Sequence, residues 1–394
     1  MNASTLRPRV ALIGVSGYGR IHLQLAREGR DRGELDIVAA AVINPEDEAE
    51  NVAELSARGC DVHADYREML RRHAGRIDLC LIPTGIHLHA RMTVDALRAG
   101  ANVLVEKPLA ASMEEVRLIQ AAERETGRFV AVGFQDCYDP GTAWLIGQLR
   151  AGAIGDVTSV RFLGVWPRPR SYFSRNDWAG RLRLGNDPVL DSPLNNAFGH
   201  FVMLSLLFAG ADEGPVETDS VELFRAHAIE SFDTGVVTLR TPQGVRLWFG
   251  ASHASNVTLE PEILIEGSAG TCCWRYENEA WLRDSSGAVQ RRPLGDQTAA
   301  RRAMMTDVIR RLHDSSAPIC TTAVAARHTA LIEAIHRAAD VCEFPAESID
   351  WVGVNGAASA VPVVTGLDAS LRRAFSELRP LRECGFPVQP VSAG

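Results

Sequence analysis

The sequence predicts an α/β N-terminal domain with a parallel sheet, followed by an α+β domain with a large, open, mostly antiparallel sheet. Three observations lead to this prediction. The first third of the chain alternates short, continuous apolar runs with amphipathic segments, and such runs form parallel strands that are covered on both faces. From about Gly155 the pattern changes to successive strand-like runs separated by turn signals. With 394 residues, 46% of them hydrophobic, the chain can form two cores.

Residues 1–135 are expected to form the first domain. Its five buried strand-like runs are RVALIGVSG, LDIVAAAVIN, RIDLCLIPT, ANVLVEKP and RFVAVGF. The helical segments between them are YGRIHLQLARE, PEDEAENVAELSARG, HARMTVDALRAG and SMEEVRLIQAAERETG. The second helix is expected to begin at Pro45, since proline and acids suit a first helical turn, and to end at Gly59. The last has Ser112 as its N-cap and Glu115 in the matching position of a capping box.

Residues 136–394 are expected to form the second domain, with a C-terminal extension from about Val361. Its strand-like runs are DVTSVRFLGVW, DSVELFRAHAI, DTGVVTLRTPQGVRLWFGAS, PEILIEGSAGTCCWRY and AWLRDSSGAVQRRPL. Its expected helices are NAFGHFVMLSLLFAG and ARHTALIEAIHRAADV. One face of such a sheet packs on helices and the other needs a cover, so we expect a homo-oligomer, a dimer or tetramer, to form there. The extension is expected to pack over the cleft or over a neighbouring subunit.

Composition excludes several classes of partner. The formal net charge is −8 and the arginines are scattered among acids, whereas a nucleic-acid partner needs a concentrated basic face. No apolar run is long enough to cross a bilayer, and the N-terminus carries no signal-peptide core. The eight cysteines lack a metal-type pair, so we expect reduced, mostly buried thiols, no metal and a cytoplasmic location.

The first apolar run ends in the glycine-rich stretch GVSGYG. Between a strand and a helix, such glycines let the backbone approach a pyrophosphate, which then binds at the positive end of the helix. An ordinary glycine turn is the alternative, but the strand–turn–helix context favours a dinucleotide. The usual fingerprint has glycine where this chain has Ser16, and Gly17 beside it can let the turn relax. The expected contacts are Gly14, Ser16, Gly17, Tyr18 and Gly19.

A ribose-binding acid is expected at the end of the second strand, where this chain has Asn44. Asparagine can still hydrogen-bond a ribose hydroxyl. The residues that follow are Pro45 and three acids, which would repel a 2′-phosphate, and no arginine lies nearby in the sequence. The cofactor is therefore expected to be NAD rather than NADP.

These motifs, with the stretch LIPTGIHLHARMTVDALRAGANVLVEKPLA, resemble the glucose–fructose oxidoreductase / inositol dehydrogenase / MocA family (Gfo/Idh/MocA). The resemblance covers most of the chain and continues through FVAVGFQDCYDP, AGAIGDVTSVRF and ALIEAIHRAADV. It implies a Rossmann domain and an NAD(P)-dependent oxidoreductase acting on CH–OH groups. It also implies cofactor contacts from Thr84, His89, Glu106, Lys107 and Gln135, the last where an amide often meets the nicotinamide carboxamide.

The most specific element of the resemblance is Glu106-Lys107-Pro108 at the end of a central strand. In the family this lysine lies between nicotinamide and substrate, and many members have a cis peptide bond before the proline. Open α/β sheets bind ligands at the carboxyl ends of their strands. Lys107 is therefore expected to hydrogen-bond a substrate hydroxyl and to favour its alkoxide character. The alternative is an exposed Glu106–Lys107 salt bridge, which stabilises little.

The resemblance also implies an acid/base histidine, oriented by an aspartate four residues earlier. His200 takes the histidine position, but Asn196 stands where the aspartate is expected. Asparagine can orient an imidazole by hydrogen bonding and cannot stabilise imidazolium as a charge. Either Asp191 supplies that charge from another angle, or His200 works without it. The alternatives are a buried structural histidine for His200 and capping roles for Asn195 and Asn196.

The segment before that helix is rich in residues that stack on and hydrogen-bond a polyol. An oligomer contact or a packed loop is the alternative for it. The candidates for a substrate-binding wall are Tyr172, Arg175, Asn176, Trp178, Arg181 and Asn195.

Two classes of function remain open at this stage. One is hydride transfer between NAD and a secondary alcohol of a sugar, inositol or related polyol, with NAD-dependent glycoside cleavage by transient oxidation as a variant. The other is a non-catalytic NAD-binding regulator. Retention of Lys107 and His200 favours the enzyme, and the missing aspartate argues slightly against it.

Overall fold

The computed structural model describes residues 7–210, 216–353 and 356–386. The chain divides into two compact units. Unit 1 comprises Met1–Tyr138 and Thr298–Ala326, and unit 2 comprises Asp139–Gln297 and Arg327–Gly394. The segment 298–326, expected from the sequence to lie in the second domain, therefore packs in the first unit.

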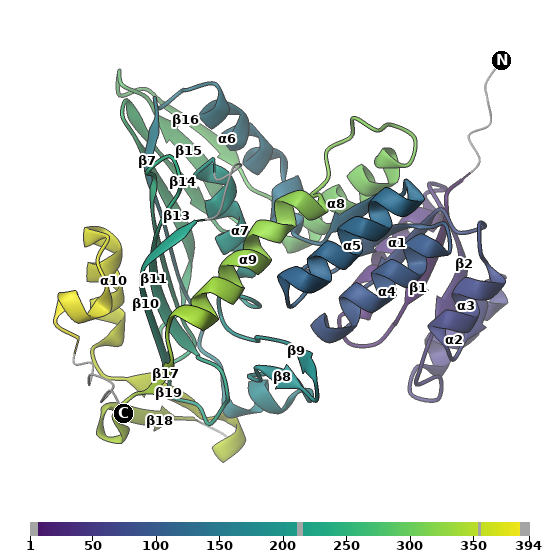
Figure 1. Cartoon of the computed structure of the whole chain (residues 1–394), viewed down its shortest axis with the longest axis horizontal. Coiled ribbons are helices and arrows are strands. Elements are labelled where there is room, and N and C mark those ends of the chain that lie inside the picture. Colours follow the sequence, from purple (N-terminus) through teal and green to yellow (C-terminus); the bar gives the residue numbers. More distant parts are fainter. Residues whose placement is uncertain (1–6, 211–215, 354–355, 387–394) are drawn as a thin grey trace. The chain divides into compact units, whose positions relative to one another are not determined.

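Unit 1 is built on a six-stranded parallel sheet, of which Figure 1 labels β1 and β2. The strand order is β3-β2-β1-β4-β5-β6. The strands are β1 Arg9–Ile13, β2 Asp36–Ala41, β3 Asp61–His63, β4 Leu79–Ile82, β5 Asn102–Val105 and β6 Val130–Val132. Every side chain of β4 and β5 is buried, as expected for strands covered on both faces. The strand order reverses at β1, whose neighbours are β2 and β4, and this switch point is where doubly wound sheets bind ligands. The predicted α/β Rossmann domain is confirmed, although the short β3 was not foreseen.

Four of the helices that lie in unit 1 were expected from the sequence, and the third and the last of those named next were not. Those that lie in it are α1 Gly19–Asp31, α2 Ala49–Ala57, α3 Tyr66–Arg72, α4 Ile86–Arg98, α5 Met113–Thr126 and most of α8 Gln297–Arg311. The side chain of Ser112 accepts a hydrogen bond from the Glu115 amide at 3.2 Å, so the predicted cap of α5 is present.

The expected start of α2 at Pro45 was wrong. Residues 45–48 form a turn in which the Glu48 amide donates to the Asn44 carbonyl at 3.2 Å, and the helix begins at Ala49. The Glu48 carboxylate is turned inward, which the acidic pattern of this stretch does not reveal.

Unit 2 contains a nine-stranded sheet in the order β16-β15-β14-β13-β7-β12-β11-β10-β17. The strands are β7 Val157–Val165, β10 Glu217–Arg225, β11 Thr234–Arg240, β12 Arg246–Ser252, β13 Leu259–Gly267, β14 Gly270–Arg275, β15 Glu279–Arg283, β16 Val289–Pro293 and β17 Val341–Glu343. Only the β7–β12 and β10–β17 pairs are parallel. The prediction of an open, mostly antiparallel sheet is confirmed. Two short hairpins accompany it, β8 Arg183–Leu184 with β9 Asp187–Pro188, and β18 Ile349–Val352 with β19 Val361–Val364.

The helices of unit 2 include two that were expected and two that the sequence reading did not identify. They are α6 Pro140–Arg150, α7 Gly199–Phe208 and α10 Leu367–Glu377, and α9 Thr322–Ala338 begins in unit 1 and continues in unit 2. Helix α6 carried a recognisable start signal, because Asp139 accepts hydrogen bonds from the Gly141 and Thr142 amides and Pro140 occupies the first turn. Helix α7 is almost completely buried, which agrees with its nearly uniform apolar sequence.

The C-terminal extension packs on the sheet of its own unit. Helix α10 lies against β7 and β12, on the face of the sheet opposite to α7 (Figure 1). Leu367 and Leu371 are fully buried in a cluster that includes Trp248, and each such leucine contributes about 1.5–3 kcal/mol by leaving water. The indole N–H of Trp248 donates to the Arg379 carbonyl at 2.8 Å. The expected cover of the cleft was wrong for the described residues, because the apolar face of the extension matches the open face of its own sheet. Contact with a neighbouring subunit stays a prediction.

This packing removes the reason given for an oligomer at the sheet. The covered part includes Leu163 of β7. Farther along the same face, Arg161 pairs with Glu266, and Arg275 pairs with Glu262 at 2.7 Å. The face is thus partly covered and partly charged, and the homo-oligomer stays a prediction.

Two expectations from composition can be compared with the fold. All eight cysteines are free, and six of them are buried, as predicted. Among the helices of the described residues, none combines the length and apolar character that crossing a bilayer requires.

Candidate functional site

The glycine turn of unit 1 has the geometry of a nucleotide-binding loop. Gly14 has φ +94° and Gly17 φ +56°, values that side chains rarely adopt. A Cβ on Gly19 would lie 2.7 Å from the Gly14 carbonyl oxygen, so helix α1 can approach strand β1 only because residue 19 is glycine. No atom lies within 4 Å of a Cβ built on Gly17. The backbone before α1 therefore leaves space of the kind a pyrophosphate occupies, and the residues present fit NAD.

Arg20, which lies near the loop after β2, is a residue that sequence reasoning missed. The guanidinium of Arg20, in the first turn of α1, pairs with the buried Glu48 carboxylate at 2.8 Å. Asn51 donates to the other oxygen of Glu48 at 2.5 Å. Asn44 lies in the turn before Glu48, and its amide is 3.4 Å from Asp47. An arginine is therefore present near this loop in space, and its charge is matched by Glu48.

Glu106 is a buried carboxylate beneath the Lys107 turn. Its Oε1 lies 2.8 Å from His22 Nε2, and its Oε2 accepts the Lys107 amide at 3.1 Å. Both His22 and Glu106 are buried. Burial alone would raise the pKa of the Glu106 carboxyl, but the His22 hydrogen bond and the Lys107 charge bring that pKa below its ordinary value. Glu106 thus fixes the backbone from which Lys107 projects, and the exposed Glu106–Lys107 ion pair considered from the sequence does not describe it.

His89 supports the same turn from helix α4. Its Nδ1 lies 2.7 Å from the Pro108 carbonyl oxygen and its Nε2 lies 3.0 Å from the Thr84 carbonyl oxygen. The peptide bond between Lys107 and Pro108 is cis, as the resemblance implied. His89 is fully buried, and burial lowers its pKa. These contacts make His89 a residue that positions the turn.

Two further predicted cofactor residues face the same end of the sheet. The Thr84 methyl lies 3.7 Å from where a Cβ on Gly14 would be, so the loops after β1 and β4 adjoin. Gln135 follows β6 and is almost fully buried. Its amide oxygen has no hydrogen-bond partner among the described residues. An unsatisfied buried acceptor is costly, so this oxygen is suited to a ligand donor such as a carboxamide.

The second group of predicted residues lies in unit 2, before and within helix α7. His200 is the second residue of α7 and is buried. The Asn196 amide donates to Asp191 Oδ1 at 2.9 Å, and Asp191 Oδ2 accepts the Gly180 amide at 2.6 Å. The two residues that the sequence offered as alternative partners of His200 are therefore bound to each other. Asp191 also anchors the preceding segment.

The remaining candidates for the substrate-binding wall form two groups. Some hydrogen-bond to backbone atoms close to them in the sequence, and others stack on one another. Asn195 donates to the carbonyls of Val189 and Leu190, so its amide satisfies the backbone. Asn176 caps the turn by accepting from the amides of Trp178 and Ala179. Capping roles were the alternative left open for Asn195, and these contacts describe such roles. Arg181 is exposed, with Glu230 4.0 Å away.

Tyr172, Arg175 and Trp178 form a stack, together with Arg168, which the sequence reading did not single out. The Arg175 guanidinium lies 3.6 Å from the Tyr172 ring centre and 5.3 Å from that of Trp178. The Arg168 guanidinium lies 4.7 Å from the same tyrosine ring. Arg168 could have been noticed in the run WPRPR, where it is one of two alternating arginines.

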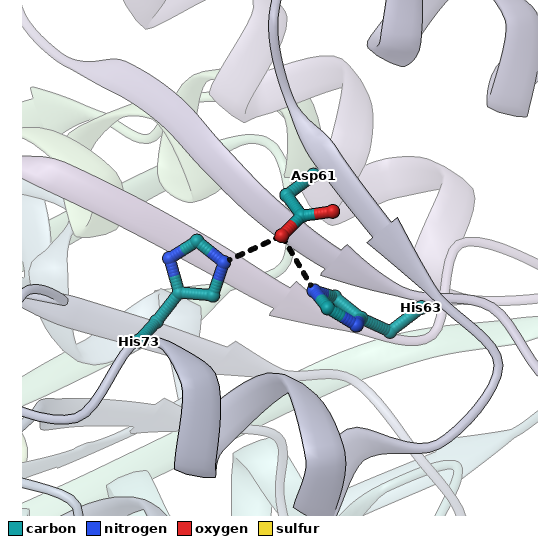
Figure 2. A group of neighbouring side chains, drawn as sticks. All are labelled: Asp61, His63 and His73. Atoms are coloured by element: carbon teal, nitrogen blue, oxygen red, sulfur yellow. Dashed lines mark hydrogen bonds and ion pairs between the residues drawn. The ribbon is translucent and has the colours of Figure 1, made fainter.

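A separate group in unit 1 has side chains that could ligate a metal ion (Figure 2). Asp61 Oδ2 lies 3.0 Å from His63 Nε2 and 3.1 Å from His73 Nε2. The hydrogen bond with His73 is the main cause that lowers the pKa of Asp61. These contacts tie the end of α3 to β3, and they link an edge strand to its helix without requiring an ion.

The sequence profile of the oxidoreductase family with an NAD-binding Rossmann fold, GFO_IDH_MocA, matches residues 8–134. The N-terminal domain of the chain is therefore similar to that of the Gfo/Idh/MocA family. The predicted resemblance is confirmed for this domain, as are the oxidoreductase class and an NAD-type cofactor that the family's description carries. The choice between NAD and NADP stays a prediction.

Individual relatives extend the similarity beyond that domain. A protein described as a UDP-kanosamine synthase oxidoreductase subunit, from Amycolatopsis mediterranei, is 28% identical over 67% of this chain and 74% of its own length. An inositol 2-dehydrogenase from Klebsiella pneumoniae is 32% identical over 39% of this chain, and the match spans 44% of that enzyme. The crystal structure of the WlbA dehydrogenase from Bordetella pertussis, in complex with NADH and UDP-GlcNAcA, has a TM-score of 0.68 at 23% identity. It covers 84% of this chain and 96% of that one, and it shows a shared fold.

Proposed function

We propose that the chain is an NAD-dependent oxidoreductase that acts on a secondary alcohol of a sugar, inositol or related polyol. The observation that carries the proposal is the identity and setting of Lys107. It is the only lysine in the chain. Of the 41 lysine and arginine residues, the other 40 are arginines. All other long-chain basic residues in the chain are arginines, and the lysine stands at the end of this one strand. It lies on a turn that buried Glu106 and His89 hold in place.

Lysine and arginine differ in a way that matters for this reaction. An ammonium is a compact charge that can shift its pKa and exchange a proton, whereas a guanidinium stays protonated. Lys107 can therefore hydrogen-bond the substrate hydroxyl and stabilise the oxygen as negative charge develops. Bound NAD would supply the hydride acceptor. His200, in unit 2, is proposed to take up the proton, with Asn196 and Asp191 orienting the segment from which it projects.

Supporting similarity comes from the named relatives, which include an inositol 2-dehydrogenase and a sugar-nucleotide oxidoreductase subunit. The first experiment is a panel of sugars and inositols, each incubated with the enzyme and NAD, with absorbance of the reduced nicotinamide as the readout. Turnover on at least one of them is expected. Binding of NAD without turnover on any member of the panel would favour a regulatory protein instead.

The second experiment isolates Lys107. On an active substrate, Lys107→Ala should lower kcat about a hundredfold or more, typical of lost acid–base catalysis, with little change in NAD affinity. Lys107→Arg should fail to restore kcat, although it keeps the charge. The control is Arg98→Ala on the exposed surface of α4, which should retain full activity. Full turnover of Lys107→Ala would refute the role.

His200 and Asp191 complete this test. His200→Ala should lower kcat to a similar extent. Asp191→Asn should cost less if the Asn196 amide is enough to keep the ring oriented. Since Lys107 is the sole lysine, an amine-specific reagent has only this residue and the terminal amine to modify. Modification should abolish turnover, and NAD with substrate should protect against it.

A further inference from the structure

The stack around Tyr172 contains positive charge that no carboxylate of the described residues neutralises by ion pairing. Arg168 and Arg175 approach the same ring at 4.7 and 3.6 Å. Within the described residues, neither guanidinium has a carboxylate within ion-pairing distance. Arg175 donates to the Tyr172 carbonyl oxygen, and the Nε of Arg168 is buried without a hydrogen-bond partner. Elsewhere in unit 2, arginines such as Arg225 and Arg275 pair with glutamates at 2.9 and 2.7 Å. The two guanidinium groups that stack on this ring are therefore not neutralised by a carboxylate of the described residues.

The polar groups around the stack do not compensate this charge. His253 packs 5.8 Å from Tyr172 and is fully buried. Burial, followed by the charge of Arg168, lowers the pKa of His253 to about 3, so its ring is neutral at physiological pH. Asp191 acts on Tyr172 from a distance, and its two oxygens accept amides of Gly180 and Asn196.

The stacking also prepares the guanidinium groups for a ligand. An arginine whose face lies on an aromatic ring loses less freedom on binding and keeps its N–H edge for a planar anion. The Tyr172–Arg175–Trp178 stack is half-buried to exposed rather than closed. The charge of Asp191 acts on Tyr172, and Asp191 is tied to Asn196 in the segment that leads into α7 and His200. A ligand group held here would belong to a molecule whose other part lies near the start of α7.

We propose that Arg168 and Arg175 form a subsite for an anionic group, a carboxylate or phosphate, of the substrate. The inference rests on the proposed function, because it names a feature of the substrate on which that function acts. It narrows the substrate class from any polyol to one that carries a negative charge, such as a sugar acid, a sugar phosphate or a nucleotide sugar.

The test is a binding measurement that does not depend on turnover. Isothermal titration of the full-length protein with saturating NAD would compare D-glucose, D-glucuronate, D-glucose 6-phosphate and UDP-glucose, which share a pyranose and differ in their anionic group. At least one anionic probe should bind about tenfold or more tightly than glucose, as expected for charge-assisted hydrogen bonds. Which probe gains most distinguishes a carboxylate from a phosphate. Equal affinity for all four would overturn the proposal.

Variants assign the gain to the two arginines. Arg175→Gln and Arg168→Gln should each remove most of the anionic advantage, measured as the affinity of each anionic probe relative to that of glucose for the same variant. The matched control is Arg170→Gln, because Arg170 lies on the same segment but stacks on Trp351 at 3.8 Å. It should keep the advantage. Arg175 is exposed, so its variant is expected to fold, and NAD affinity would verify this.

Two outcomes separate the subsite from the function on which it rests. If the anionic advantage is present and depends on the arginines but no probe is turned over, hydride transfer fails and the subsite stands. If a neutral polyol is turned over and the anionic advantage persists in Arg168→Gln and Arg175→Gln, the subsite is refuted and the oxidoreductase stands. Raising NaCl from 50 to 300 mM should weaken only the anionic probes.

Discussion

Removing His22 should destabilise unit 1 by a pH-dependent amount. The His22→Leu change leaves the Glu106 carboxylate buried and without the ring nitrogen that lies 2.8 Å from it. Breaking a buried pair in this way costs about 3–5 kcal/mol. For a unit of this size, that corresponds to a fall of roughly 6–20 °C in the melting temperature.

The pH dependence follows from the Glu106 pKa. In the wild type this pKa is lowered, so its contribution to stability is present above the unfolded value of about 4.3 and is lost as the pH falls through the folded value. Without His22, burial would dominate and raise the pKa. The variant should therefore lose stability as pH rises from the unfolded value toward the raised folded value. The difference between the two proteins should widen by up to about 1.4 kcal/mol per pH unit over this range.

Urea unfolding followed at several pH values between 4 and 8, without NAD, measures this difference. His22→Gln keeps a donor and should recover part of the loss. The surface control on the same helix is Gln24→Leu, which should change stability by no more than about 0.5 kcal/mol. A His22→Leu penalty below about 1 kcal/mol, or one that stays constant from pH 4 to 8, would refute the assignment of a charged, His22-dependent Glu106.

Three further predictions concern the cofactor, the extension and assembly. Titration should show tighter binding of NAD than of NADP. Asn44→Asp should sharpen this preference, and Glu48→Gln should weaken it by freeing Arg20 for a 2′-phosphate. Tighter binding of NADP than of NAD by the wild type would contradict the assignment. Leu371→Ala should destabilise unit 2 by about 2–5 kcal/mol in thermal unfolding, because a buried leucine of α10 leaves a cavity, and an unchanged melting temperature would show that α10 does not pack as described. The chain is expected to be a homo-oligomer in light scattering, and a monomer at micromolar concentration would be the contrary result.

The sequence by itself determined the fold class and the place of the nucleotide loop. Continuous apolar runs such as Val103–Val105 can be satisfied only by cover on both faces, so a parallel sheet follows from local pattern. Gly14 and Gly19 signal a close backbone approach because no other residue tolerates it. Ser112 and Glu115 mark a helix start through contacts within one turn. In each case the physical cause acts between residues that are close in the sequence, so the sequence alone predicts the result.

The tertiary structure decided which distant residues support the site. The pairing of His22 with Glu106, of Arg20 with Glu48 and of Asp191 with Asn196 depends on where folded elements meet. The same holds for the burial of α10 on its own sheet. The free energy gained by burying apolar surface is proportional to the buried area and does not depend on direction. Periodicity therefore predicts that a face is buried, but not which element covers it. Ion pairs likewise form between residues that are far apart in the sequence, so only the folded structure determines which charges become neighbours.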